Sequence, residues 1–375
     1  MRIVVAMDSF KGSLGSMEAG EAVIEGIRNA LPSASVALHP LADGGEGTAY
    51  IITEALGGKV VSLTVTGPLG EPTQAEYGIL PHGIAIMEIA SAAGLTLIPR
   101  ERRNPMHTTT YGVGEMILDA YNRGCRSFMI GLGGSATNDG GMGMLSALGW
   151  KFQDKNRDPV AATAEGLQDL DKILPSPIEK TLTACSFRVA CDVNNPLLGQ
   201  DGCSAVFAPQ KGAKDEDILR MDQWLGHYAA LTGKLYPHVD PALRGGGAAG
   251  GLGYAFVSYL QASLEPGAEL IASLSGLEEN IRRADLIITG EGSLDRQSAM
   301  GKGPGYVAAL GKKYGKKVLA LAGRIGSGAE ACHDVGITAY FPIHPSPMSI
   351  DEAMNPQTTY RDLKNTAQQL LQALL

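Results

Sequence analysis

The chain has 375 residues, of which 44% are hydrophobic and 19% charged, and its formal net charge at pH 7 is −8. This length allows two or three domains with sizeable cores, and the composition excludes an extensively disordered chain. The negative charge argues against a nucleic-acid partner, and no apolar stretch approaches the roughly 20 residues of a membrane span. Five cysteines without a C-x-x-C pair are typical of reduced thiols, so we expect a cytoplasmic protein.

The first 60 residues alternate between strand and helix patterns. The continuous apolar run at 3–7 predicts a buried parallel strand. Apolar residues at spacing four from Ala19 to Leu31 predict a helix that ends before Pro32. A second strand, "SVALHP" at 35–40, leads through "DGGEGT" into a second predicted helix.

The last 90 residues repeat this alternation. Three apolar runs at 285–290, 317–323 and 337–343 predict buried strands with helices between them. The C-terminal helix is predicted to bury one stripe that consists of Leu363, Ala367, Leu370 and Leu374. Two strands from one end of the chain and three from the other predict a five-stranded parallel sheet covered on both faces.

The middle of the chain follows a different pattern. Three strand-like runs between residues 59 and 90 are separated by the turn signals "GPLGEP" and "PHG", which leave no room for helices and predict an antiparallel meander. We therefore expect the α/β class with two domains. Residues 1–60 plus 285–375 form a doubly wound parallel domain, residues 61–284 form an inserted mixed α/β domain, and the active site lies in the cleft between them.

Polar segments follow several of the predicted strands at their carboxyl ends. They read "DSFKGSLGS" from Asp8, "LADGGEGT" from Leu41, "CDVNNPLLG" from Cys191 and "GEGSLDRQSAMGKGP" from Gly290. Each segment alone is also explained as an ordinary turn, because Asp, Asn and Ser stabilise turns locally. Their repetition at strand ends, with lysines beside several carboxylates, favours one shared site for phosphate and a divalent metal.

The glycine-rich segment "GLGGSATNDGGMGM" at 131–144 has two interpretations. Its first six residues fit the G-x-G-x-x-A dinucleotide fingerprint directly after a predicted strand. The acid Asp139, however, would repel a pyrophosphate unless a cation lay between them, which favours a metal-assisted cradle for nucleotide phosphates. No Gly-Lys pair is followed by Ser or Thr, so a P-loop is absent. His107 and His344 stand alone in turn-rich sequence and are expected to be solvated or internally satisfied.

Taken together, seven segments resemble those of the bacterial type I glycerate kinases. They are "DSFKGSL", "LADGGEGT", "GLGGSATNDGGMGML", "ACDVNNPLLG", "FAPQKGA", "GGGAAGGLGYA" and "GEGSLDRQSAMGKGP", and they run in that family's order. The resemblance implies a flavodoxin-like domain that holds an inserted domain similar to the restriction-endonuclease fold. It also implies ATP- and Mg²⁺-dependent phosphorylation of D-glycerate, with 2-phosphoglycerate as the associated product. A homodimer stays open as its assembly.

On this resemblance, particular residues receive expected roles. Asp192 accepts the proton of the glycerate hydroxyl or holds Mg²⁺, with Glu291 as a further metal candidate, and Lys11 and Lys302 neutralise the transferring phosphate or the glycerate carboxylate. Backbone N–H groups near the start of a helix are expected to bind the ATP phosphates; this cofactor-binding set consists of Gly133, Gly134, Ser135, Thr137 and Asn138. The expected substrate-binding set consists of Ser9, Asp43, Glu46, Asn195 and Asp295.

Two other functions remain open from the sequence. The fingerprint match "GLGGSA" allows an NAD-dependent oxidoreductase that acts on a small hydroxy acid. A split two-domain α/β fold also serves non-catalytic proteins, so a sugar-acid binding protein is the third candidate. Dependence on ATP and Mg²⁺ distinguishes the kinase from both.

Overall fold

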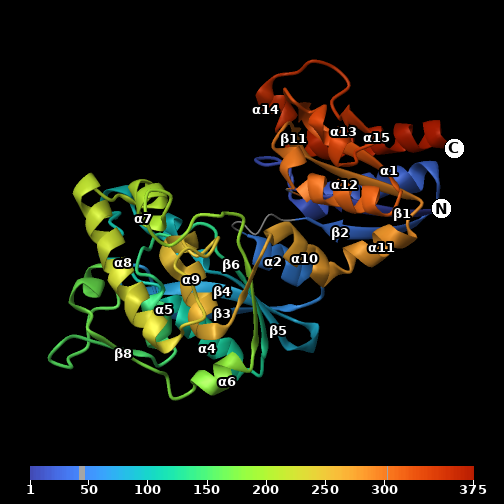
Figure 1. Ribbon diagram of the computed structural model, residues 1–375. Coiled ribbons are helices and arrows are strands. Elements are labelled where there is room, and N and C mark those ends of the chain that lie inside the picture. The colour runs from blue at the N-terminus through green and yellow to red at the C-terminus, as the bar shows by residue number, and fades with distance from the viewer. Residues whose placement is uncertain (42–46, 302) are drawn as a thin grey trace. The chain divides into compact units, whose positions relative to one another are not determined.

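The structure is a computed structural model, and it describes residues 1–41, 47–301 and 303–375 (Figure 1). The chain divides into two compact units. We call Met1–Asp43 together with Ala268–Leu375 the terminal unit, and Gly44–Gly267 the inserted unit. The sequence pattern placed the domain boundaries at 60/61 and 284/285 instead. Helix α2 (Thr48–Ala55) packs against β3, β4 and β5 and so belongs with the inserted unit.

The terminal unit contains a five-stranded parallel sheet with the order β13-β12-β11-β1-β2, as predicted. Its strands are β1 (Arg2–Met7), β2 (Ser35–Pro40), β11 (Leu286–Leu294), β12 (Lys317–Ile325) and β13 (Ala339–Pro342). Numbered along the chain within this unit, the order is 2-1-3-4-5, which is the flavodoxin-like order. The strand order therefore reverses between β1 and β11, and ligands of such sheets bind at the carboxyl ends of strands beside this point.

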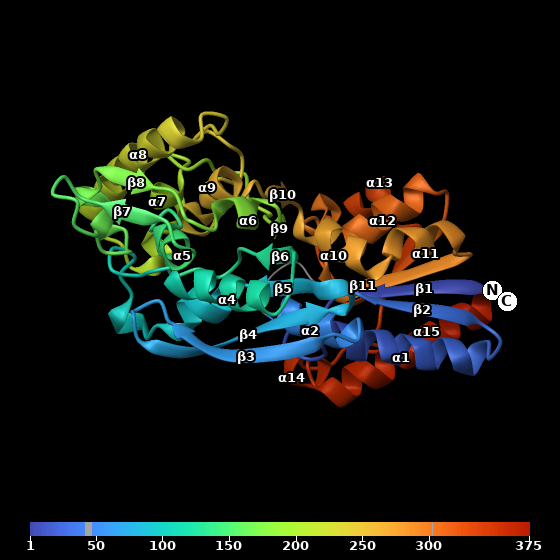
Figure 2. The same ribbon diagram turned by 90° about the horizontal axis from the view of Figure 1, so that it is seen from below.

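Helices cover both faces of this sheet (Figure 2). Helices α1 (Ser16–Ala30) and α15 (Pro356–Leu374) lie on one face, where they pack on Ile3, Val5 and Met7. Val4 and Ala6 point to the other face. That face is covered by α11 (Leu277–Arg283) and α12 (Gly303–Lys313). Because both faces of β1 are buried, its sequence is a continuous apolar run instead of an alternating one. The unit also contains α10 (Gly267–Ser275), α13 (Ala331–Val335) and α14 (Ile350–Ala353).

The stripe predicted for the C-terminal helix is only partly correct. Leu363 and Ala367 are fully buried, but Leu370 is half-buried and Leu374 is 50% exposed. The buried row instead continues to Leu371, because α15 packs on α1 along its i, i+4 ridge.

The inserted unit is built on a six-stranded mixed sheet with the order β10-β9-β6-β5-β4-β3. The pairs β3–β4 and β4–β5 are antiparallel, which confirms the predicted meander, and the remaining pairs are parallel. Its strands are β3 (Lys59–Thr66), β4 (Pro72–Leu80), β5 (Ile84–Glu88), β6 (Ser127–Gly131), β9 (Ser186–Ala190) and β10 (Ser263–Glu265). A second, two-stranded sheet pairs β7 (Lys151–Gln153) with β8 (Lys172–Leu174).

Successive residues of β4 show how the two faces of this sheet are covered. Tyr77 is buried in the main core and donates to Asp119 of α4 (Tyr111–Asn122) over 2.6 Å. Gly78 faces α2, where a Cβ atom would collide with Thr53. The other helices of the unit are α3 (Ala90–Ala93), α5 (Met142–Ala147), α6 (Glu179–Thr183), α7 (Cys203–Phe207), α8 (Asp215–Leu235) and α9 (Ala248–Leu260). Among the helices described in either unit, none is both long and apolar enough to span a membrane.

Candidate active site

Two acidic residues lie on adjacent segments of the terminal sheet at the point where the strand order reverses: Asp8 directly follows β1, and Glu291 lies within β11. Met7 at the end of β1 is paired with Gly290 of β11, so the residues that come next, Asp8 and Glu291, lie side by side. The amide of Asp8 donates to the carbonyl of Gly290 over 2.8 Å and fixes this arrangement. The parallel sheet thereby places two carboxyl groups where the fold class binds its ligands.

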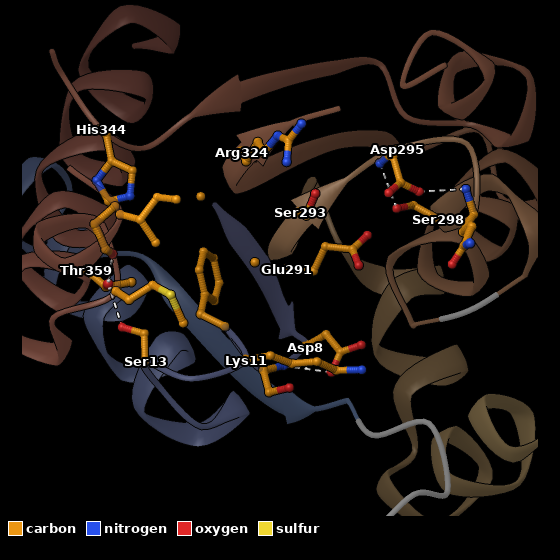
Figure 3. Close-up of a pocket in the computed structure, with 18 residues that line it drawn as sticks. Asp8, Lys11, Ser13, Glu291, Ser293, Asp295, Ser298, Arg324, His344 and Thr359 are labelled. Atoms are coloured by element: carbon orange, nitrogen blue, oxygen red, sulfur yellow. Dashed lines mark hydrogen bonds between the residues drawn. The ribbon is translucent and has the colours of Figure 1, made fainter. Parts of the chain in front are cut away.

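A pocket of about 500 Å³ opens at this edge (Figure 3). Four of the predicted site residues line it, namely Ser9, Lys11, Glu291 and Asp295. Asp8 lines it as well. The segments "DSFKGSL" and "GEGSLD" therefore contribute to one site, although 275 residues lie between them along the chain.

Glu291 is a carboxyl group of this pocket whose pKa is raised. Burial, followed by the negative charges of Asp8 and Asp295, raises its pKa to about 7. Its Oε1 is buried and has no hydrogen-bond partner among the residues that the structure describes. A buried carboxylate oxygen without a donor, beside other carboxylates, is suited to receive a cation.

The two aspartates of the pocket are held by backbone groups. The Ser9 amide donates to Asp8 Oδ1 over 2.6 Å, and the Gln297 amide donates to Asp295 Oδ1 over 2.7 Å. A Cβ atom on Gly303 would lie 2.7 Å from Asp8 Oδ2, so the glycine lets the start of α12 approach this carboxylate. Both carboxylates are therefore positioned before any ligand arrives.

Two cationic side chains in the pocket are left for a ligand. Lys11 and Arg324 are exposed and line the pocket, and neither makes a hydrogen bond or ion pair with another described residue. Arg324 was not among the predicted site residues. A signal for it exists in the sequence, since "GRIG" follows a buried apolar strand as the other polar segments do.

His344, which was expected to be solvated or internally satisfied, belongs to the pocket lining. Its Nδ1 lies 3.0 Å from Oδ2 of Asp362, which is only 2% exposed, and this contact orients the ring toward the pocket. The expectation of an internally satisfied histidine is therefore confirmed for His344, which the sequence did not place in a pocket. The partner lies on the C-terminal helix, and nothing in the local sequence around His344 indicates it.

In the inserted unit, the glycine-rich segment and the segment around Asp192 leave one edge of the sheet. Gly131 ends β6 and is paired with Glu88 on one side and Ala190 on the other. The carboxyl ends of three parallel strands thus lie in one row. The predicted sites on these two segments come from the same edge of the sheet, as expected.

The glycine-rich segment does not open a helix, so that part of the phosphate-site prediction is wrong. Residues 132–141 are irregular, and α5 begins only at Met142. The N–H groups of Gly141 and Gly143 donate to the carboxylate of Asp139 over 3.1 Å each. The start of the helix is therefore occupied by the chain's own carboxylate. The same observation removes the basis for a dinucleotide fingerprint, which requires the helix to begin at its glycines.

Three of the five predicted cofactor-binding residues are turned into the interior. Ser135, Thr137 and Asn138 are at most 8% exposed. Asn138 donates to the Ser204 hydroxyl over 2.9 Å. Gly133 and Gly134 are exposed, so only their part of the loop is accessible.

Lys211 of "FAPQKGA", whose role the sequence did not indicate, holds this loop. It is 2% exposed, and its Nζ donates to Ser135 Oγ over 2.8 Å and to the Thr137 carbonyl over 2.7 Å. Burial lowers its pKa to about 8, while the thiol of Cys203 and the carboxyl group of Asp139 act in the opposite direction. A buried ammonium group thus fixes the backbone between the accessible glycines and Asp139.

The pKa of Lys211 predicts how stability depends on pH. Between about pH 8 and 10.5 the unfolded chain keeps this proton while the folded protein releases it. The free energy of unfolding should therefore rise with pH in this window, by up to about 1.4 kcal/mol per pH unit. Urea titrations across the window measure this slope. In Lys211→Met the contribution should disappear, and an unchanged slope in that variant would contradict the assignment.

Asp192 and Asn195 follow β9. Asp192 is exposed, and its Oδ1 accepts a hydrogen bond of 2.9 Å from the amide of Gly267, the first residue of α10. Asn195 is half-buried and donates through Nδ2 to the carbonyl of Asp201 over 2.8 Å. Asp192 thus keeps a second carboxylate oxygen for other partners, whereas the amide group of Asn195 serves its own loop.

Three of the predicted residues, Asp43, Glu46 and Lys302, lie outside the described residues. In the ranges 1–41, 47–301 and 303–375, no three His, Cys, Asp or Glu side chains are close enough together to hold a metal ion by themselves. The described residues by themselves thus offer a metal at the pocket one or two carboxylates.

Comparisons with known proteins agree over nearly the whole chain. The family model described as "Glycerate kinase family" matches residues 3–375. The glycerate 2-kinase of Escherichia coli (strain K12) is 44% identical over 355 residues, which cover 94% of this chain and 93% of that protein. The glycerate kinase of Halalkalibacterium halodurans is 42% identical over 353 residues, which cover 94% and 93% of the two chains.

A solved structure is similar over the full length. A crystal structure from Salmonella typhimurium LT2, described as a candidate glycerate kinase 2, has a TM-score of 0.91 and 41% sequence identity, and covers 100% of this chain and 98% of that chain. One family assignment follows from three observations: the strand order of the terminal sheet, the polar pocket where that order reverses, and the similarity to these proteins. The chain belongs to the glycerate kinase family.

Proposed function

We propose that the protein transfers the γ-phosphoryl group of ATP to D-glycerate and gives 2-phosphoglycerate and ADP. The observation that carries this proposal is the pocket of the terminal unit, in which Lys11 and Arg324 pair with no other described residue and the half-buried Glu291 lies beside them. Small anions require such cations, and phosphoryl transfer requires mainly positioning and neutralisation of charge. The relative from E. coli, named glycerate 2-kinase, supports the 2-position.

The pocket also fits Mg²⁺. This ion is commonly held by one or two carboxylates together with water and substrate phosphates. Glu291 Oε1, to which no residue in the described part of the chain donates, and the carboxylate of Asp8 are the groups that would hold it. When bound, the ion neutralises charge on the phosphate oxygens.

The residues of the chain then have separate roles. Lys11 and Arg324 bind anionic oxygens of the two substrates, and the backbone N–H groups of Gly133 and Gly134 are further phosphate donors in the exposed part of the glycine-rich loop. Asp192 receives the proton of the attacking hydroxyl or contributes to metal binding. We also infer a cytoplasmic location from the five free cysteines, four of which are buried.

The pKa of Glu291 gives this proposal a pH signature. The carboxyl group must be ionised to bind a cation, and it ionises with a pKa of about 7. The value of kcat/KM at limiting Mg²⁺ should therefore rise by about tenfold per pH unit below pH 7 and level off above it. In Glu291→Gln this limb should vanish and kcat/KM at pH 8 should be lower. An identical limb in the variant would exclude Glu291 as its origin.

The function is tested by following ADP formation with ATP, Mg²⁺ and D-glycerate. We expect ADP release that requires all three and that produces an acid-stable phosphate ester in equal amount. Oxidation or reduction of a nicotinamide cofactor with the same acid would instead indicate an oxidoreductase. Saturable binding of glycerate without ADP release would indicate a binding protein.

A further inference from the structure

The pocket of the terminal unit has two unlike ends. Asp8, Glu291 and Asp295 lie at one end, and His344 and Thr359 lie at the other (Figure 3). Lys11 and Arg324 lie between the two ends in this view. The apolar side chains of Phe10, Ile350, Ala353 and Met354 also line the pocket. The Ala353 carbonyl of α14 accepts a hydrogen bond from Thr359, so α14 lies at the end away from the carboxylates.

Two of these apolar side chains are exposed to an unusual degree. Ile350 is 75% exposed and Met354 is 43% exposed, although both line a pocket. They are four residues apart at α14, so both can face the same side. Exposed large apolar side chains that gather at a concave site indicate a ligand with an apolar surface.

The apolar wall is held in place by hydrogen bonds. Ser349 and Glu352 form a capping box at the start of α14, with the Ser349 amide donating to Glu352 Oε2 over 3.0 Å. At the other end, the Thr359 hydroxyl donates to the Ala353 carbonyl over 3.0 Å and lies 2.6 Å from the hydroxyl of Ser13. The wall is therefore tied to α15 and to the loop after β1.

One polar group is directed into the apolar end. The ring of His344 is fixed through Nδ1 by Asp362, and Nε2 has no partner among the described side chains or backbone groups. Asp362 also accepts from Arg361 Nε over 2.9 Å, so its position does not depend on a ligand. A ligand bound at this end therefore contacts apolar side chains and one nitrogen atom, His344 Nε2, whose orientation is fixed.

We propose that the apolar end binds the purine ring of the nucleotide, against Phe10, Ile350 and Met354, with His344 Nε2 as a hydrogen-bond partner, and that Lys11 and Arg324 hold its phosphates. A three-carbon acid has no apolar surface to cover this wall. The volume of about 500 Å³ lies in the range of about 300–1,000 Å³ of sites for larger ligands. The proposal rests on the proposed function, because that function requires ATP.

The test compares a nucleotide with a phosphate chain that has no base. Binding of ADP and of inorganic tripolyphosphate is measured by calorimetry for the wild type, for Ile350→Ser and for the double variant I350S/M354S. Both side chains are substantially exposed, so folding should be unaffected. Leu219→Ser in α8 is the matched control, because Leu219 is 69% exposed and does not line the pocket.

We expect the Kd of ADP to rise about tenfold in the double variant and less in I350S, because apolar contact with the base is lost. The Kd of tripolyphosphate and the KM of D-glycerate should change less than about twofold, and L219S should behave as the wild type. Unchanged ADP binding, or equal weakening of ADP and tripolyphosphate, would overturn the proposal. ADP binding is measured without phosphoryl transfer, so the result stands apart from whether glycerate is the acceptor.

Discussion

Asp192→Asn should lower kcat by about 10²- to 10⁴-fold, which is the usual contribution of a positioned proton acceptor. Asparagine keeps a carbonyl oxygen for the 2.9 Å hydrogen bond from the Gly267 amide, so the start of α10 should be preserved. Only the negative charge and the basicity are lost. Steady-state rates with ATP, Mg²⁺ and D-glycerate measure the effect, and urea titration should give an unchanged free energy of unfolding.

Asp201→Asn is the control for this variant. Asp201 lies in the same loop region and is exposed, and only its backbone carbonyl bonds to Asn195. It should retain the wild-type kcat. If Asp192 holds Mg²⁺ instead of a proton, excess Mg²⁺ should restore much of the activity of D192N. A kcat within threefold of the wild type at every Mg²⁺ concentration would exclude both roles.

The second large effect concerns stability. Asp139→Ala should lower the free energy of unfolding by about 3–5 kcal/mol, because it removes a buried charged acceptor. Asp139 is 0% exposed and accepts from the Thr110 amide over 2.9 Å, the Thr110 hydroxyl over 2.7 Å and the two amides at the start of α5. Burial raises its pKa, and these hydrogen bonds act in the opposite direction. The substitution would leave these donors buried and would remove a negative charge near Lys211.

Asp154→Ala separates the effect of burial from the number of hydrogen bonds. Asp154 accepts from the amides of Asn156 and Asp158 over 2.8 Å each, but in a solvent-exposed turn. Its replacement should lower the free energy of unfolding by no more than about 1 kcal/mol. Equal losses in D139A and D154A would contradict the structural role assigned to Asp139.

Strong periodicity made much of the fold predictable. The run at 3–7 predicted a strand buried on both faces and lies within β1, and the predicted strand 35–40 coincides with β2. The C-terminal stripe failed at Leu374 because the contact with α1 determines which row of α15 is buried. Local pattern predicts the element, whereas its packing partner decides which residues are covered.

The site was less predictable, because its contacts connect distant parts of the chain. Glu291 and Lys11 could be found because each belongs to a polar segment that comes after an apolar run, and these two runs are paired in the sheet. His344 and Lys211 could not, because their partners, Asp362 and Ser135, lie on other elements. The glycine-rich loop was wrongly predicted to be the start of a helix. Helix α5 begins only at Met142, after an irregular segment that starts at Leu132. The sequence does not show that the carboxylate of Asp139 accepts the hydrogen bonds of the amides at this helix start.

The position of the new phosphate is the most direct test of the proposed activity. The protein is incubated with ATP, Mg²⁺ and D-glycerate, and the product is coupled to enolase with and without phosphoglycerate mutase. Enolase accepts 2-phosphoglycerate directly, so we predict an immediate signal without the mutase. A signal only in the presence of mutase would show the 3-isomer and contradict the 2-position, and no signal in either case, with no ADP formed, would contradict glycerate phosphorylation itself.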